Sequence, residues 1–303
     1  MKIKQEKLLL GHKSGIYGLE AVDDDHFLSA AGDGWIVEWP IQAGEDGNLL
    51  LQIEAQIFAL SYHKASGQIW AGDMNGGVYI SDYREKSLLK KVSHHNKGTY
   101  AVEARPEFIF TSGADGVFSL WSPDSLRPEE SVQVSRKHLR AVSFHPTRPV
   151  MAVAGGDGHI YIFHTTSWQC IQQIEVAHER SIFDLKFHPS GNQLISGGMD
   201  AHLKVWNWEE ARLEHKVPAH VFTINGLAID SKGLWLATAS RDNSIKIWDL
   251  KTIMLEKVID STKKNFHMNS VNAIFFHDKS RQWISAGDDR TIRLWSMHND
   301  DQN

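Results

Sequence analysis

An Asp or Asn followed six positions later by a Trp, or by a residue in its place, recurs seven times along this chain of 303 residues. Five copies keep both residues, in the pairs Asp33–Trp39, Asp115–Trp121, Asp200–Trp206, Asp242–Trp248 and Asp289–Trp295. Two degenerate copies, Asn75 to Ser81 and Asp157 to Phe163, fill the gaps between them. The Trp-equivalent positions lie 42, 40, 42, 43, 42 and 47 residues apart. A period in the low forties over seven copies predicts a repeat architecture in place of two unrelated domains.

Each copy carries the turn and strand signals of a β-structure. Pairs that favour two-residue hairpin turns, Asp-Gly, Asn-Gly or Asp-Asn, occur at 33–34, 75–76, 115–116, 157–158 and 242–243. Polar and apolar residues alternate around them, as in Ser244, Ile245, Lys246 and Ile247, and no window shows a sustained helical period. Four short strands in each of seven repeats predict an all-β fold, a seven-bladed β-propeller of four-stranded blades.

These repeats resemble the WD40-repeat family over nearly the whole chain, although only repeat six keeps the literal Trp248-Asp249 pair. The resemblance implies a hydrogen-bonded set of one His, one Ser or Thr, the turn Asp and the Trp in each complete repeat. The five sets are His12, Ser29, Asp33 and Trp39; His95, Thr111, Asp115 and Trp121; His178, Ser196, Asp200 and Trp206; His220, Thr238, Asp242 and Trp248; and His267, Ser285, Asp289 and Trp295. Repeats two and four lack most of this set, so we expect neighbouring blades to hold them more than internal polar bonds do.

The five sets are interpreted as scaffold and not as catalytic triads. A Trp that buries its rings still needs an acceptor for its indole N–H, and the hydroxyl supplies one. The hydroxyl then donates to the His, and the His donates to the Asp that braces the turn. An enzyme has no use for five copies of such a set around a ring, so we expect no catalytic residues.

The repeats predict one propeller domain over residues 1–303. Its repeats fall roughly at 11–54, 55–93, 94–135, 136–176, 177–218, 219–260 and 261–303. Only eight residues follow Trp295, which leaves no room for a fourth strand in the last repeat. We therefore expect residues 1–10 to supply the outer strand of the last blade, which removes two exposed sheet edges.

Composition limits the classes of partner. The net charge of −5 and the isoelectric point near 6.4 oppose bulk attraction to nucleic acid or anionic lipid. The sequence contains no run of 18 apolar residues, so it predicts no membrane span, and its single cysteine excludes an internal disulfide. Seventeen His residues show no consistent ligand spacing, so we expect no metal and no cofactor. Together these features indicate a soluble cytoplasmic protein.

Positions that do not belong to the five hydrogen-bonded sets point to a binding site at one mouth of the central channel. In a propeller the first strand of each blade lines the channel, and in related WD40 proteins the face formed by its start and by the second-to-third-strand turns is the usual peptide-binding surface. Aligning the seven first strands gives one residue per blade near this mouth: Tyr17, Phe58, Tyr100, Arg140, Phe183, Asn225 and Asn272. The residues before the turn Asp or Asn add Met74, Met199, Arg241 and Asp288 to the same face.

Aromatic residues, Met and Arg are enriched at the centres of protein interfaces. We therefore predict a non-catalytic scaffold that works in a multiprotein complex. The mouth would bind a peptide or a protruding side chain of another protein through an aromatic or cationic anchor. Alternatively, the aromatic residues pack between blades and fill the channel.

Two other functions stay open. An enzyme would need a non-repeated cluster of titratable residues in the channel, and the aligned inner positions supply only Arg140 and amides, with Arg241 and Asp288 nearby. Single-stranded nucleic acid could stack on the aromatic ring, which the acidic charge opposes.

Two further regions are weaker candidates for contacts. The longer connection at 260–266, with Lys263, Lys264 and Phe266, could contact an acidic partner. The loops at 42–47 and 123–128, on the opposite face, show no binding signal.

Overall fold

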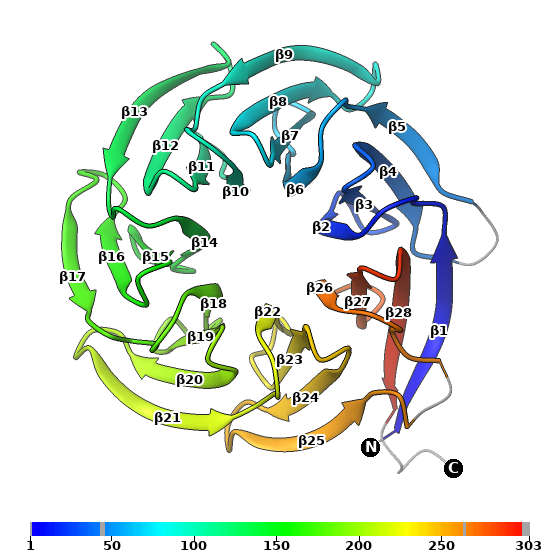
Figure 1. The fold of residues 1–303 in the computed structure, drawn as a ribbon, viewed down its shortest axis with the longest axis vertical. Coiled ribbons are helices and arrows are strands. Elements are labelled where there is room, and N and C mark those ends of the chain that lie inside the picture. The colour runs from blue at the N-terminus through cyan, green and yellow to red at the C-terminus, as the bar shows by residue number, and fades with distance from the viewer. Residues whose placement is uncertain (1, 43–45, 263–264, 299–303) are drawn as a thin grey trace.

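The computed structural model describes residues 2–42, 46–262 and 265–298. These residues form seven antiparallel four-stranded sheets, set as blades around a central channel (Figure 1). Within these ranges no helix is long and apolar enough to cross a membrane. The seven-bladed β-propeller predicted from the repeats is confirmed.

The strands of each blade run in chain order from the channel to the outer rim, except in the last blade. Blades one and two comprise β2 (Ile16–Ala21), β3 (His26–Ala31), β4 (Trp35–Pro40) and β5 (Asn48–Gln52), then β6 (Ile57–His63), β7 (Gln68–Asp73), β8 (Gly77–Asp82) and β9 (Ser87–Ser93). Blades three and four comprise β10 (Thr99–Ala104), β11 (Ile109–Gly113), β12 (Val117–Ser122) and β13 (Arg127–Gln133), then β14 (Leu139–Phe144), β15 (Val150–Gly155), β16 (Ile160–His164) and β17 (Cys170–Ile174). Blades five and six comprise β18 (Ile182–Phe187), β19 (Leu194–Gly198), β20 (His202–Asn207) and β21 (Arg212–Pro218), then β22 (Ile224–Ile229), β23 (Trp235–Ser240), β24 (Ile245–Asp249) and β25 (Met254–Ile259). Blade seven comprises β26 (Val271–His277), β27 (Gln282–Gly287), β28 (Thr291–His298) and β1 (Lys2–Leu10).

The closing strand comes from the other end of the chain, as the sequence predicts. Strand β1 pairs antiparallel with β28, from Lys2 opposite His298 to Leu10 opposite Thr291 (Figure 1). Leu9 is buried in a core that also contains Ile16 of blade one and Ile292 of blade seven. Both ends of the described chain therefore hold the same blade. Met1 lies outside the described residues.

The turn between the second and third strands is longer than the sequence predicts. In blade one, β3 ends at Ala31 and β4 begins at Trp35, so the turn has three residues and not two. The Gly34 amide donates to the Ala31 carbonyl at 3.1 Å, and Gly34 has a φ of +78°. A β-turn followed by one left-handed residue is the usual three-residue hairpin. Asp33 stands in the middle of the turn, where its carboxylate accepts the Trp35 amide at 2.9 Å.

The core lies between blades. The cluster around blades three and four joins Phe110 and Phe118 of one blade to Leu139 and Phe163 of the next, all buried. Each blade buries both faces of its sheet against its neighbours, while its outer strand and loops face solvent and its inner strand lines the channel. The blades therefore act as one packed unit that positions the inner strands.

Candidate functional site at the channel mouth

In five blades the turn Asp, the His, the hydroxyl and the Trp are joined by hydrogen bonds. The indole N–H of each Trp donates to the Ser or Thr oxygen at 2.7–3.1 Å. The same oxygen lies 2.7–3.0 Å from Nε2 of the His. Nδ1 of the His lies 2.8–3.2 Å from the Asp carboxylate. The geometry is the same five times, so these residues serve the scaffold of each blade.

Burial keeps these His residues neutral. Desolvation lowers the pKa of His178 below its usual range, although the Asp200 carboxylate opposes this change. A neutral His can accept the hydroxyl proton at Nε2 and donate its Nδ1 proton to the carboxylate. Burial disfavours the charged form of Asp200, but hydrogen bonds from His178 and the His202 backbone outweigh it and lower the pKa of Asp200.

Blades two and four have polar anchors of their own, in addition to the packing of neighbouring blades that the sequence predicts. In blade two the Tyr79 hydroxyl donates to Asp73 at 3.0 Å, and Asp73 also accepts the Gly77 amide at 2.6 Å. In blade four the Tyr161 hydroxyl donates to Asp157 at 2.8 Å. Each Tyr stands two residues before the Trp-equivalent position on the third strand. A phenol therefore braces the turn carboxylate where the His is missing.

The seven mouth positions share one backbone feature. In every blade the pairing between the first and second strands slips by one residue, which marks a β-bulge with one extra residue on the first strand. In blade one Ile16 pairs with Ala31 and Gly18 pairs with Ala30, so Tyr17 is the extra residue. The extra residues of the other blades are Phe58, Tyr100, Arg140, Phe183, Asn225 and Asn272. Bulges redirect side chains, and here they turn all seven toward the channel.

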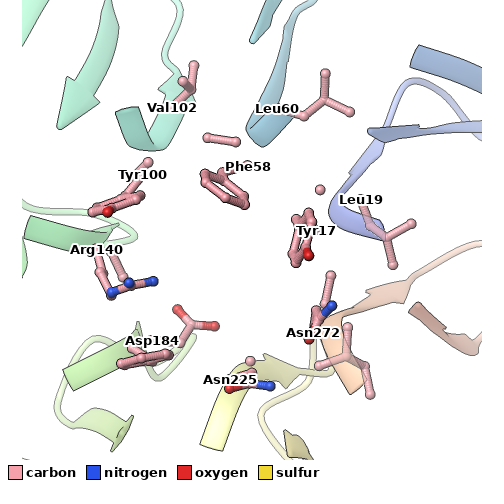
Figure 2. A pocket seen from close by; sticks show the side chains of 18 of the residues that line it. Tyr17, Leu19, Phe58, Leu60, Tyr100, Val102, Arg140, Asp184, Asn225 and Asn272 are labelled. Atoms are coloured by element: carbon pink, nitrogen blue, oxygen red, sulfur yellow. The ribbon is translucent and has the colours of Figure 1, made fainter. Parts of the chain in front are cut away.

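These side chains line a cavity of about 630 Å³ (Figure 2). Arg241 and Asp288, from the second-to-third-strand turns of blades six and seven, line the same cavity. Met74 and Met199 occupy the equivalent turns of blades two and five, but they do not line it and are 43% and 42% exposed. The structure therefore brings together nine of the eleven residues predicted for the mouth, while the two Met residues lie on the face outside it.

One arc of the mouth is aromatic and holds a cation. The rings of Tyr17 and Phe58 meet edge to face at a centroid distance of 5.0 Å, and those of Phe58 and Tyr100 lie 6.1 Å apart. The guanidinium carbon of Arg140 lies 4.4 Å from the Tyr100 ring centre and 4.3 Å from that of Phe183. Arg140 is thus held between two aromatic rings, a favourable cation–π arrangement.

The other arc consists of amides and one carboxylate. Asn225 Nδ2 donates to the Ser270 hydroxyl at 2.9 Å, and Ser270 donates to Asn272 Oδ1 at 2.8 Å. Asn272 Nδ2 donates to Asp288 Oδ1 at 2.7 Å. Burial, and then the charge of Asp288, raise the pKa of the Tyr17 hydroxyl. These polar side chains therefore hydrogen-bond to one another, whereas the side chains of the aromatic arc contact one another through their rings.

Four charged residues deeper in the channel were missed, so the expectation that the inner positions supply only Arg140 and amides is wrong. Glu20, Glu103, Asp184 and Lys186 also line the cavity. They stand one or three residues after the bulge residue of their strand. The other blades have only Gly or Ala at the position of Asp184, a contrast that an alignment of the complete first strands would have revealed.

The deep charges bind neighbouring blades to one another. The Asp184 carboxylate accepts the Leu185 amide of its own strand and the Leu227 amide of blade six, each at 2.8 Å. Lys186 Nζ lies 3.5 Å from Asp184 Oδ1. Glu20 of blade one accepts the Ser61 hydroxyl and the Tyr62 amide of blade two, at 3.1 and 3.2 Å.

Replacing Glu20 by Gln is expected to stabilise the ring at alkaline pH. Burial, and next the charge of Glu103, raise the pKa of Glu20 to about 8. In the unfolded chain this carboxyl ionises near its ordinary value, so its destabilising effect grows as the pH rises from about 4.5 to about 8. At about 1.4 kcal/mol per pKa unit, reduced for the open channel, we expect Glu20→Gln to gain about 1–3 kcal/mol at pH 8.5 and little at pH 4.5.

Urea unfolding of both proteins across this pH range measures the difference. The amide oxygen of Gln can still accept the bonds from Ser61 and Tyr62, so the contact between blades one and two remains. A constant difference between the two proteins at all pH values would contradict the raised pKa.

The weaker candidate regions lie partly outside the described residues. In the connection at 260–266, Asp260 accepts the Thr262 amide at 3.0 Å, while Lys263 and Lys264 lie outside the described residues. Residues 43–45 of the loop at 42–47 also lie outside them. Among the residues that the structure describes, no group of three or more His, Cys, Asp or Glu side chains could hold a metal ion.

Comparisons with known proteins agree with this architecture. The family model "WD domain, G-beta repeat" matches residues 129–164, 168–207, 211–249 and 261–296. The crystal structure of the WD40 beta propeller domain of Doa1 superposes with a TM-score of 0.86 over 98% of each chain, at 14% identity. This likeness shows the shared fold.

The curated relatives are longer proteins. Pre-mRNA-processing factor 19 of Oryza sativa subsp. japonica is 23% identical over 80% of this chain and 46% of its own length. The probable coatomer subunit beta' of Schizosaccharomyces pombe is 31% identical over 43% of this chain and 16% of its own length. Striatin of Homo sapiens is 26% identical over 64% of this chain and 26% of its own length. The chain thus spans less than half the length of each of these relatives. On its repeats and its fold, the chain belongs to the WD40-repeat family of β-propellers.

Proposed function

We propose that this chain is a non-catalytic protein-interaction module whose channel mouth binds a peptide segment or a protruding side chain of a partner protein. One observation carries the proposal. Seven equivalent β-bulges direct their extra residues into one cavity, and five of those residues are large aromatic or cationic side chains.

The bulge itself does not require such side chains. The same backbone position accepts Asn in blades six and seven, where the amides complete a polar network. In blades one to five the exposed edges of Tyr, Phe and Arg surround the opening instead. Residues of these types carry much of the binding energy at protein interfaces.

The wider setting favours protein partners in an assembly. One matched relative is, by its name, a coatomer subunit. Family resemblance implies peptide binding at this face. We extend the proposal to a cytoplasmic location, on the grounds of the single cysteine and the acidic net charge.

The alternatives have less support. Catalysis in the channel would use the deep charges, but Asp184 already accepts bonds from blades five and six, and Glu20 of blade one already accepts two bonds from blade two. Nucleic acid would meet the carboxylates of Glu103, Asp184 and Asp288 along the same channel. The hydrogen bonds of the deep charges favour a structural role for them, and the carboxylates along the channel favour a protein ligand over nucleic acid at the mouth.

The test compares partners captured by the intact chain and by the variant Tyr100→Ala, Phe183→Ala. These two side chains are half-buried, so we expect the variant to fold with a loss of about 1–3 kcal/mol and to lose at least one partner in quantitative affinity purification. The control, Leu88→Ala with Leu89→Ala, removes two exposed apolar side chains on outer strand β9. An unchanged partner set in the folded mouth variant would show that the aromatic residues only pack.

A further inference from the structure

Arg140 lacks the oxygen partner that comparable cations have. Among the residues that the structure describes, Arg140 makes no hydrogen bond and no ion pair, and its buried Nε has no acceptor. Other cations held inside the ring are satisfied: Lys204 and Lys246 each donate to a backbone carbonyl at 2.5 Å, and Arg293 donates to Gln5 at 2.6 Å. A buried donor without an acceptor is costly, so this guanidinium is poised for a ligand oxygen.

The two stacked rings fix how Arg140 can be approached. Tyr100 and Phe183 cover the two faces of the guanidinium, which leaves only its edge for contact. Figure 2 shows the nitrogen atoms of Arg140 directed into the channel, beside the ring of Tyr100. The N–H groups of Arg lie in its plane as a fork that matches a planar two-oxygen acceptor.

We propose that the partner inserts a carboxylate, from an Asp or Glu side chain or a C-terminus, into the mouth and pairs it with the edge of Arg140. This inference rests on the proposed function and names the chemistry of the ligand for that same cavity. The stacked rings pre-orient the Arg, so little side-chain freedom is lost when the ligand binds.

A cationic anchor, one of the possibilities considered from the sequence, fits this mouth poorly. The space between Tyr100 and Phe183 is filled by the Arg140 side chain itself. A Lys or Arg side chain from a partner would therefore be repelled by the charge of Arg140, which already occupies the space between these two aromatic rings.

A carboxylate also fits better than a phosphate. Besides Arg140, the cavity lining carries the cations Arg241 and Lys186, and the latter pairs with Asp184. Against these stand Asp184, Asp288, Glu103 and Glu20, and burial raises the pKa of Glu20 to about 8. A single negative charge next to Arg140 is compatible with this balance, whereas a dianion would be repelled by the nearby carboxylates.

The experiment uses an array of short peptides in which each position is varied through Glu, Gln, Lys, Phe and phosphoserine. It is probed with the purified chain and with Arg140→Gln, Arg140→Lys and the control Arg127→Gln, which removes an exposed cation on outer strand β13. The tightest peptides should share one Glu position. By fluorescence titration, changing that Glu to Gln should weaken binding to the intact chain about tenfold or more.

With Arg140→Gln the same peptide change should alter affinity by less than about twofold, because the paired charge is gone. Arg140→Lys should recover only part of the effect, since it lacks the planar fork. Arg127→Gln should keep the full Glu preference. Thermal unfolding checks that each variant is folded.

The outcomes separate the two claims. If peptides bind and Tyr100→Ala with Phe183→Ala abolishes binding, but Lys or no charge is preferred, the carboxylate inference fails and the proposed function stands. A preference for phosphoserine over Glu would overturn the choice of a carboxylate. If no peptide binds the intact chain, both claims are contradicted.

Discussion

A variant that lacks residues 2–10 is expected to unfold at least about 10 °C below the full chain, a loss of roughly 5 kcal/mol. Strand β1 is the outer strand of blade seven, and its removal leaves β28 as an unpaired edge. It also withdraws Leu9 from the core shared by blades one and seven. Blade seven would then consist of β26, β27 and β28 only, and all three come from the C-terminal part of the chain. Because the N-terminus would no longer close the ring, the whole propeller should lose stability. Scanning calorimetry measures the change.

Adding the missing strand back tests whether pairing causes the effect. A synthetic peptide with the sequence of residues 2–10 should restore much of the lost unfolding temperature, in proportion to its concentration. A peptide with the same residues in scrambled order is the control. An unchanged unfolding temperature after the deletion would show that the ring does not depend on this closure.

Replacing Thr238 by Val is expected to cost about 2–4 kcal/mol, although the two side chains have nearly the same shape. The Thr238 hydroxyl is fully buried and serves two groups. The indole of Trp248 donates to it at 3.1 Å, and Nε2 of His220 lies 2.7 Å from it. Val would leave both groups buried without a partner. Urea unfolding gives the free energy of unfolding for each protein.

The matched control is Thr238→Ser, which removes a methyl group and keeps the hydroxyl. Ser occupies the same position in blades one, five and seven, as Ser29, Ser196 and Ser285, so blades of this kind accept it. We expect it to cost about 1 kcal/mol. Equal losses in the two variants would mean that the methyl group matters and the hydrogen bonds do not.

The fold follows from the sequence because the repeat pattern encodes it in local chemistry. Asp33 and its counterparts mark the second turn of each blade, and the excess of sequence before His12 predicts the closing strand. The turn length was wrong because Asp33-Gly34 is compatible with two hairpin types, and only the strand pairing distinguishes them. The tyrosine anchors of blades two and four were missed because the repeat signature names no Tyr on the third strand, although Asp157, which accepts the bond from Tyr161, is itself a turn Asp of the pattern.

The mouth could be predicted only in part. One residue per blade was found by alignment, because every first strand carries its bulge at the same place. The bulge also shifts the alternation of side chains, so the residues beyond it, such as Glu20 and Lys186, do not fall where a regular strand would put them. The position of Arg140 between Tyr100 and Phe183 joins three blades, and no pattern within one repeat can show it.

Site-specific photo-crosslinking tests most directly whether the mouth binds a partner. A photoreactive phenylalanine replaces Phe58 in the mouth, and in a second protein it replaces Leu234, which is 52% exposed in the loop between β22 and β23, at the opposite end of the inner strand from Asn225. We expect the probe at 58 to crosslink a partner protein, and we expect the Tyr100→Ala, Phe183→Ala background to abolish that crosslink. Crosslinking from 234 alone, or from 58 regardless of the background, would contradict a binding site at the channel mouth.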